Sequence, residues 1–154
     1  MVGDGFDREW LGENLQRREL LGTLRGEALS QAYASMDVFV FPSQTDTFGN
    51  VILEAMASGV PPIVTSGGGP KYMIRHGDTG FVAGGAQEFA DRVIDLSNDP
   101  ERRRRMGQAA RDYAARCSWE SVFEGVYQRY IDALGPEFCT AQSPSGQKYQ
   151  TNPR

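Results

Sequence analysis

The chain has 154 residues, hydrophobic side chains at 40% of its positions and a net charge of −4. That length suits a single domain, and the composition excludes a chain that is disordered throughout. The negative balance gives no global basic field, so we expect no nucleic-acid partner. No apolar run approaches the ~20 residues that a membrane-spanning helix needs.

Cysteine and histidine are scarce in this sequence. Its two cysteines, Cys117 and Cys139, are far apart, and there is one histidine. This pattern does not have the ligand spacing of a zinc site, so we expect no metal. The first residues also lack the basic and apolar regions of a signal peptide, which makes the cytoplasm the expected compartment.

The first quarter of the chain predicts short elements. A glycine-rich turn occupies residues 3–5, and residues 7–15 predict a short helix with Trp10 facing the core. Residues 19–22 predict a short strand that ends in glycine. Apolar residues at helical spacing then predict a helix over residues 27–36.

The middle of the chain alternates strands and helices. Residues 37–41 form a continuous apolar run, which is typical of a strand buried in a parallel sheet. A helix is expected over residues 50–58, where Gly59 ends it. Residues 61–65 and 81–83 predict two further strands. Such alternation predicts an α/β fold, a Rossmann-like parallel sheet with flanking helices.

The last third predicts helices only, over residues 87–97, 100–117 and 119–134. We expect one domain over residues 1–134 and a disordered tail over residues 135–154, which are rich in Pro, Ser, Gln and Thr. The run of four arginines that begins at Arg102 favours a solvated helix face. Peripheral contact with anionic lipid at a membrane surface is the alternative.

The strongest chemical signal surrounds the helix that begins at Asn50. A helix that follows a buried parallel strand directs its N-terminus to the carboxyl edge of the sheet, where its free amides favour an anion. Asp46 and Glu54, with seven residues between them, flank that point, and Gly49 leaves the backbone open. A ligand with hydroxyls and a phosphate would satisfy all these groups. The simpler alternative makes Asp46 a turn residue, Asn50 a helix cap and Glu54 the partner of an arginine.

The block over residues 41–61 resembles the signature of the retaining GT-B glycosyltransferases of group 1, or family 4, in which two acids are separated by seven residues. Shorter segments at residues 3–5, 21–22, 33–40 and 76–82 resemble flanking parts of the same family, in the same order. The first acid is Asp46, where the family more often has Glu. An Asp-Thr-Phe-Gly sequence resembles members that use GDP-mannose, and a UDP-hexose donor remains the alternative.

The resemblance implies a hexosyltransferase of glycan or glycolipid biosynthesis, with a nucleotide-sugar donor, a glycan or lipid acceptor and no metal or other cofactor. It implies transfer with retention and makes Asp46 and Glu54 the catalytic residues. The donor-binding residues that it implies are Thr23, Leu24, Phe48, Gly49, Asn50, Val51 and Glu54.

The resemblance covers residues 1–134 and implies the C-terminal, donor-binding half of the GT-B fold. The acceptor-binding half would then be a missing partner, as would the first strand and helix of this half, with the basic residues that clamp the diphosphate. We therefore expect this polypeptide alone to be unstable and inactive. A non-catalytic nucleotide-sugar-binding module, or an inactive fragment, is the alternative.

Overall fold

The structure is a computed structural model of the chain in which residues 1–134 are described. The chain divides into two compact units, Met1–Ala115 and a second that begins at Arg116. The predicted tail, residues 135–154, lies outside the described residues.

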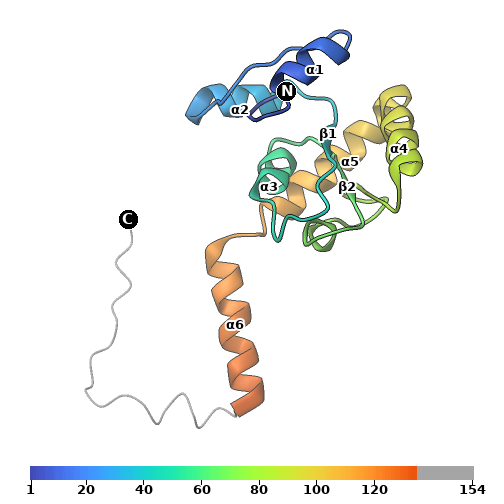
Figure 1. Cartoon of the computed structure of the whole chain (residues 1–154). Coiled ribbons are helices and arrows are strands. Elements are labelled where there is room, and N and C mark those ends of the chain that lie inside the picture. Colours follow the sequence, from blue (N-terminus) through green and yellow to red (C-terminus); the bar gives the residue numbers. More distant parts are fainter. Residues whose placement is uncertain (135–154) are drawn as a thin grey trace. The chain divides into compact units, whose positions relative to one another are not determined.

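Short elements build the first unit, and most of them are labelled in Figure 1. They are α1 (Arg8–Asn14), α2 (Gly26–Ala34), β1 (Phe39–Phe41), α3 (Asn50–Ala57), β2 (Pro62–Thr65), the 3-10 helix η1 (Pro70–Met73), β3 (Phe81–Ala83), α4 (Ala86–Asn98) and α5 (Pro100–Ala114). The second unit contains α6 (Trp119–Leu134).

The three strands form one parallel sheet in the order β1-β2-β3. Val40 pairs with Ile63, and Val64 pairs with Val82, so β2 is the central strand. This confirms the predicted α/β fold with a parallel sheet. Among the described residues, the outer edge of β1 has no paired strand, and Val40 on it is 47% exposed.

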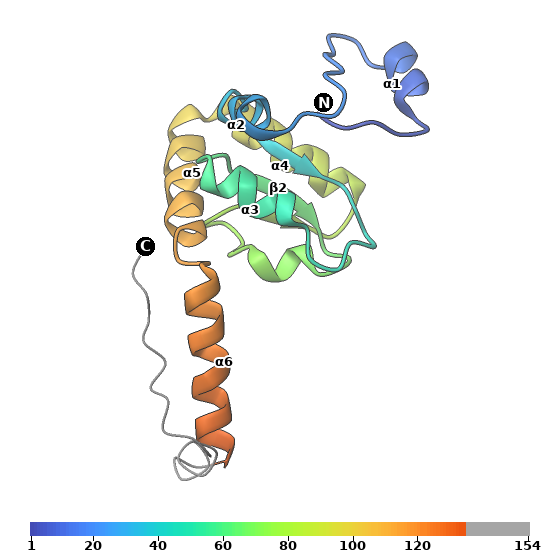
Figure 2. The same ribbon diagram turned by 90° about the vertical axis from the view of Figure 1, so that its left-hand side faces the viewer.

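Helices cover both faces of the sheet, because successive residues of a strand point to opposite faces. Ile63 of β2 packs with Phe81 and with Leu96 of α4. The next residue, Val64, packs with Ile52 of α3. Figure 2 shows α3 and α4 on the two sides of the strands. The carboxyl ends of the strands, with the loops that follow them, are therefore held in place from both sides.

The long helix α5 lies closer to the core than the sequence suggests. The run of four arginines favoured a solvated face, yet the helix buries Met106, Gly107 and Ala110. A Cβ atom on Gly107 would collide with the carbonyl oxygen of Gly59, which ends α3. The glycine pair lets α5 approach α3 closely. Arg104 and Arg105 are exposed, as the predicted solvated face requires, whereas the Arg103 side chain is 20% exposed and pairs with Asp37 (3.2 Å).

The N-terminal region, residues 1–25, corrects two predictions. No strand forms over residues 19–22, although Leu21 donates a backbone hydrogen bond to Met1 (3.0 Å) and Gly3 donates one to Gly22 (2.8 Å). Positive φ angles at Gly3 (120°) and Gly22 (70°) prevent these bonds from extending into a regular ladder. Trp10, predicted to face the core, is 59% exposed.

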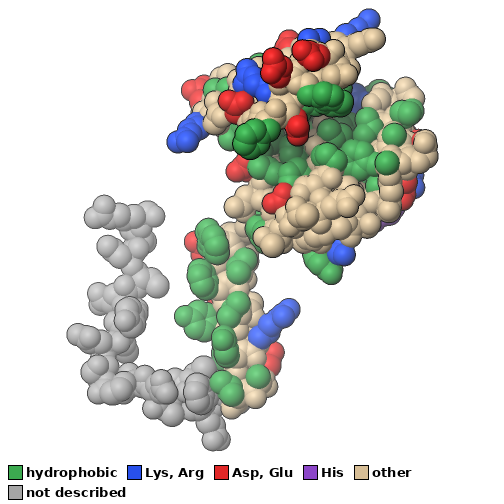
Figure 3. Space-filling model, viewed as in Figure 1, with side chains coloured by type: hydrophobic (Ala, Val, Ile, Leu, Met, Phe, Trp, Pro, Cys, Tyr) green, Lys and Arg blue, Asp and Glu red, His purple; other side chains and the backbone are tan. Residues whose placement is uncertain are grey.

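Helix α6 carries a continuous apolar face along its whole length, visible as green side chains in Figure 3. Its large exposed side chains are Trp119, Val122, Phe123, Val126, Tyr127, Tyr130 and Leu134. The spacing of three and four residues makes α6 amphipathic, and the helix itself confirms the one predicted over residues 119–134.

Candidate functional site

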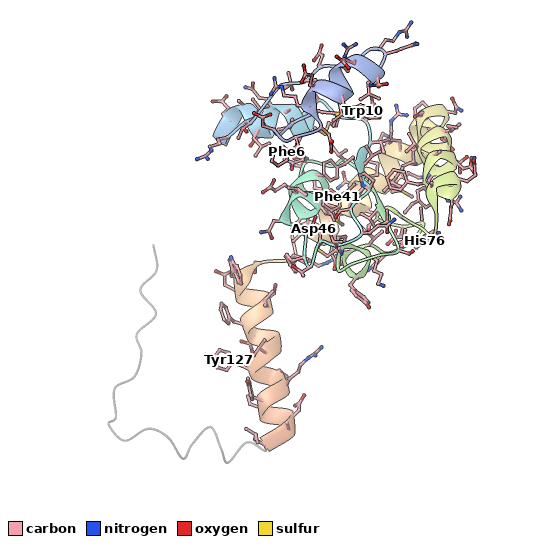
Figure 4. The ribbon with its side chains drawn as sticks, in the orientation of Figure 1. Phe6, Trp10, Phe41, Asp46, His76 and Tyr127 are labelled. Atoms are coloured by element: carbon pink, nitrogen blue, oxygen red, sulfur yellow. The ribbon has the colours of Figure 1, made fainter. Side chains whose placement is uncertain are left out.

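The loop between β1 and α3 holds the first predicted acid, Asp46, which lies beyond Phe41 at the carboxyl end of β1 (Figure 4). The Asp46 backbone N–H donates to the Ser43 hydroxyl (3.3 Å), and its carbonyl accepts a hydrogen bond from the Gly69 N–H (2.9 Å). The backbone is thus fixed on both sides while the residue is exposed. The carboxylate is free to meet a ligand from solvent.

The glycine run at residues 67–69 lies in the loop between β2 and η1. It allows this loop to approach the loop of Asp46 closely. A Cβ atom on Gly69 would collide with the carbonyl oxygen of Thr47, and one on Gly68 would lie 2.5 Å from the carbonyl oxygen of Asp46. Only glycine permits this backbone contact. The run therefore contacts the backbone of the Asp46 loop, and Gly67 also lines a cleft at the carboxyl edge of the sheet.

Helix α3 begins at the end of this loop, with Gly49 as its N-cap at φ 76° and ψ 63°. The simpler interpretation of the sequence made Asn50 the cap, and the structure corrects it by one residue. The αL conformation is the reason, because glycine adopts it without strain. No side chain caps the helix, and no acidic residue occupies its first turn. The amides of Asn50 and Val51 therefore lie at an end of the helix that favours an anion.

Glu54 lies one turn into α3. Six of the other seven residues of this helix are apolar, which would favour burial on all sides, yet only Ile52, Ala55 and Met56 are buried and Glu54 is exposed. The helix therefore has a solvent face, and Glu54 is on it. No arginine pairs with Glu54 among the described residues, in contrast to the simpler interpretation.

Tyr33 of α2 is the site residue that sequence reasoning missed. Its hydroxyl donates a hydrogen bond to Glu54 Oε2 (2.9 Å), and its side chain is buried. Burial, and secondly this hydrogen bond, raise the pKa of Tyr33 above its ordinary value. The signal in the sequence was a polar aromatic residue on the inward face of the helix predicted over residues 27–36.

The remaining predicted donor residues fall at two places. Phe48 precedes the N-cap of α3 and is 55% exposed. Thr23 and Leu24 lie between Gly22 and α2, and α2 in turn packs against α3. No hydrogen bond joins Asp46 to Glu54 in residues 1–134. The convergence of all these residues on one ligand stays a prediction.

A cleft of about 400 Å³ opens at the same edge of the sheet. It lies beyond all three strands, and its walls include Gln44, Thr65, Ser66, Gly84 and Gly85. Neither predicted acid lines it. No helix of residues 1–134 has the length and apolar character to cross a membrane. The same residues contain no cluster of three or more side chains suited to a metal ion.

The fold is a Rossmann-like α/β domain in which a helix without a side-chain cap follows a parallel strand. The family model described as "Glycosyl transferases group 1" matches residues 2–113. The chain therefore belongs to the group 1 glycosyltransferase family.

Three similar proteins place the chain within that family. A GDP-mannose-dependent alpha-mannosyltransferase of Mycolicibacterium smegmatis is 41% identical over 138 residues, 88% of this chain and 36% of that protein. Sulfoquinovosyl transferase SQD2 of Arabidopsis thaliana is 42% identical over 128 residues, 79% of this chain and 25% of that protein. The crystal structure of Anabaena HepE in complex with UDP and glucose matches with a TM-score of 0.65 and 25% identity, over 86% of this chain and 39% of that one. The chain thus spans about a quarter to a third of the length of the curated relatives named here.

Proposed function

We propose that this chain provides the donor site of a retaining hexosyltransferase and that a nucleotide sugar binds at the start of α3. One observation carries the proposal: an uncapped helix N-terminus follows a buried parallel strand, with Asp46 before it and Glu54 one turn inside. The amides of Phe48, Gly49, Asn50 and Val51 contact the diphosphate and the sugar hydroxyls.

The two acids have different tasks in this proposal. Glu54 accepts hydrogen bonds from the ribose hydroxyls, and Asp46 contacts the transferred hexose near its anomeric carbon. The diphosphate leaves while the α3 dipole stabilises its charge, and an acceptor hydroxyl on a glycan or lipid takes the sugar with retained configuration. The transition state resembles an oxocarbenium ion, as in glycoside hydrolysis. No metal is needed.

GDP-mannose is the donor that we propose. The 41% identity with a GDP-mannose-dependent mannosyltransferase supports it, as does the Asp-Thr-Phe-Gly sequence that begins at Asp46. A UDP-hexose is the second candidate, because the similar HepE structure is a complex with UDP and glucose. The base would lie against Thr23 and Leu24.

Binding without transfer is the second candidate function for the chain alone. The observation that favours it is length, since the chain corresponds to 36% of the mannosyltransferase that it resembles. An acceptor site would come from elsewhere. We therefore expect the isolated chain to bind the donor and to show no turnover.

Calorimetric titration of the chain with GDP-mannose, GDP, UDP-glucose and free mannose tests the proposal. We expect one site per chain that prefers a nucleotide sugar to the free sugar. Glu54→Gln weakens the interaction about tenfold, because a charge-assisted hydrogen bond contributes roughly 1.5 to 3 kcal/mol. Asp46→Asn removes the advantage of GDP-mannose over GDP. Glu101→Gln, an exposed glutamate of α5, is the matched control and leaves affinity unchanged. Absence of nucleotide-sugar binding, or equal affinity in Glu54→Gln, would contradict the proposal.

A further inference from the structure

The contact between Tyr33 and Glu54 joins a buried donor to an exposed acid across two helices. Tyr33 is 6% exposed, and its hydroxyl lies 2.9 Å from Glu54 Oε2. Glu54 is exposed and would sample many side-chain conformations if nothing held it. The hydrogen bond from the buried Tyr33 hydroxyl therefore restricts the orientation of the Glu54 carboxylate.

Tyr33 itself is held by packing. Its ring lies 5.8 Å from the ring of Phe39, centroid to centroid, and Ala55 and Val60 share the same buried cluster. A tyrosine hydroxyl is protonated at neutral pH, and a carboxylate has no proton to give, so Tyr33 is the donor in this hydrogen bond. One oxygen of Glu54 is thus occupied by the protein, and the other remains available to accept from a ligand.

We propose that Tyr33 is a positioning residue that orients Glu54 to receive a vicinal pair of ligand hydroxyls, the ribose diol of a nucleotide. This inference rests on the proposed function, because it concerns the same donor site. A preorganised acceptor binds a diol better than a mobile one, since less side-chain entropy is lost on binding. Tyr33 contributes to affinity only through Glu54 and touches no substrate atom.

The test compares GDP with 2′,3′-dideoxy-GDP, and UDP with its dideoxy form, by calorimetry on the 154-residue chain. The native chain is expected to prefer the ribose form by about tenfold, the scale of one charge-assisted hydrogen bond. Tyr33→Phe keeps the ring and removes the donor. It is expected to reduce that preference to about threefold or less, and Glu54→Gln is expected to reduce it similarly. The double variant should add little to either single change.

Two controls separate positioning from general damage. Ile63→Val trims a buried cluster that does not include Tyr33 and is expected to lower Tm without changing the ratio of the two affinities. Tyr127→Phe, on the exposed face of α6, should change neither quantity. A variant that merely destabilises the fold lowers the affinity for both nucleotides equally. The ratio of the two affinities therefore reports on Glu54 alone.

The possible failures are distinguishable. A native chain that binds nucleotide, with a Tyr33→Phe variant that keeps the native ratio, overturns the inference and leaves the proposed function intact. A native chain that binds no nucleotide overturns both. A ligand-free measurement checks the contact itself: in a chain with ¹³C-labelled tyrosine, Glu54→Gln is expected to shift the Tyr33 Cζ resonance. An unchanged resonance would overturn the inference.

Discussion

The packed region, residues 39–114, and the N-terminal region, residues 1–25, belong to the same unit but are held by different forces. In the packed region Ile52 and Ile63 are completely buried between the sheet and its helices. In the N-terminal region Phe6 and Trp10 are exposed, and α1 buries no residue. The first region is stabilised by apolar burial and the second mainly by local polar contacts.

This difference matters for the proposed donor site because its residues come from both regions. Asp46 and Glu54 belong to the packed region, where the surrounding backbone is fixed. Thr23 and Leu24 belong to the N-terminal region, whose only ion pair among the described residues joins Arg8 and Asp4 at the surface. Surface pairs of this kind contribute at most about 1 kcal/mol. We therefore expect the phosphate and ribose contacts to be preformed and the base contacts to be adaptable.

The largest expected difference between the regions is a loss of core packing. Ile63→Ala removes a fully buried side chain from the central strand and should lower the free energy of unfolding by about 2 to 5 kcal/mol. Trp10→Ala removes a larger side chain that is 59% exposed and should cost less than about 1 kcal/mol. Urea unfolding at low protein concentration measures both. Equal losses would show that the N-terminal region is packed as tightly as the core.

The loop contact behind Asp46 gives the next largest effect. Gly69→Ala forces a Cβ atom into the Thr47 backbone and should destabilise the chain by about 1 to 3 kcal/mol. It should also weaken nucleotide-sugar binding, because the Asp46 loop has to move. Gly5→Ala in the N-terminal region meets no atom within 4 Å and serves as the control. Equal Tm values for the two variants would contradict the close contact between Gly69 and the Thr47 backbone.

Helix caps allow a smaller comparison. Asp99 caps α5 by accepting a hydrogen bond from the Arg102 N–H (2.9 Å), whereas Asp7 occupies the N-cap position of α1 without such a bond. Asp99→Ala should cost about 1 kcal/mol, and Asp7→Ala should be close to neutral. Thermal unfolding of the two variants measures the difference. A larger loss in Asp7→Ala would contradict the structure of the N-terminal region.

The smallest expected effect depends on pH. The Gly84 N–H, which donates to Glu88 Oε2 (2.8 Å), and secondly Arg92 hold the pKa of Glu88 below its ordinary value of 4.5. A carboxylate with a lowered folded-state pKa stabilises the fold above its unfolded pKa, and this contribution is lost as the pH falls through the folded value. Glu88→Gln should therefore flatten the loss of stability below about pH 4.5. If Glu88→Gln left the pH dependence of the free energy of unfolding in acid unchanged, Glu88 would not contribute to it.

Sequence periodicity was sufficient for the packed region. The apolar run at residues 37–41 predicted a buried parallel strand, and the structure places β1 there with β2 and β3 beside it. It failed in the N-terminal region, where the predicted strand at residues 19–22 and an inward Trp10 both depended on tertiary contacts that this region does not make. In this chain, local patterns predicted structure well where burial of apolar side chains stabilises the predicted element.

The site was predictable in position and less so in detail. The spacing of Asp46 and Glu54 about the start of a helix follows from the sequence alone. The cap shifted to Gly49 because its φ of 76° is a backbone property that residue identity only suggests. The Tyr33 contact joins residues 21 apart, so the helical pattern indicated an inward tyrosine but not its partner Glu54.

Ligand binding at the start of α3 is the central claim, and amide chemical shifts test it most directly. GDP-mannose titrated into ¹⁵N-labelled chain should shift the amide resonances of Gly49, Asn50 and Val51 most strongly, with smaller changes at Thr23 and Leu24. Glu54→Gln should reduce all of these shifts at the same ligand concentration. Largest shifts at Ser66, Gly84 and Gly85, which line the cleft beyond the strands, would contradict the claim.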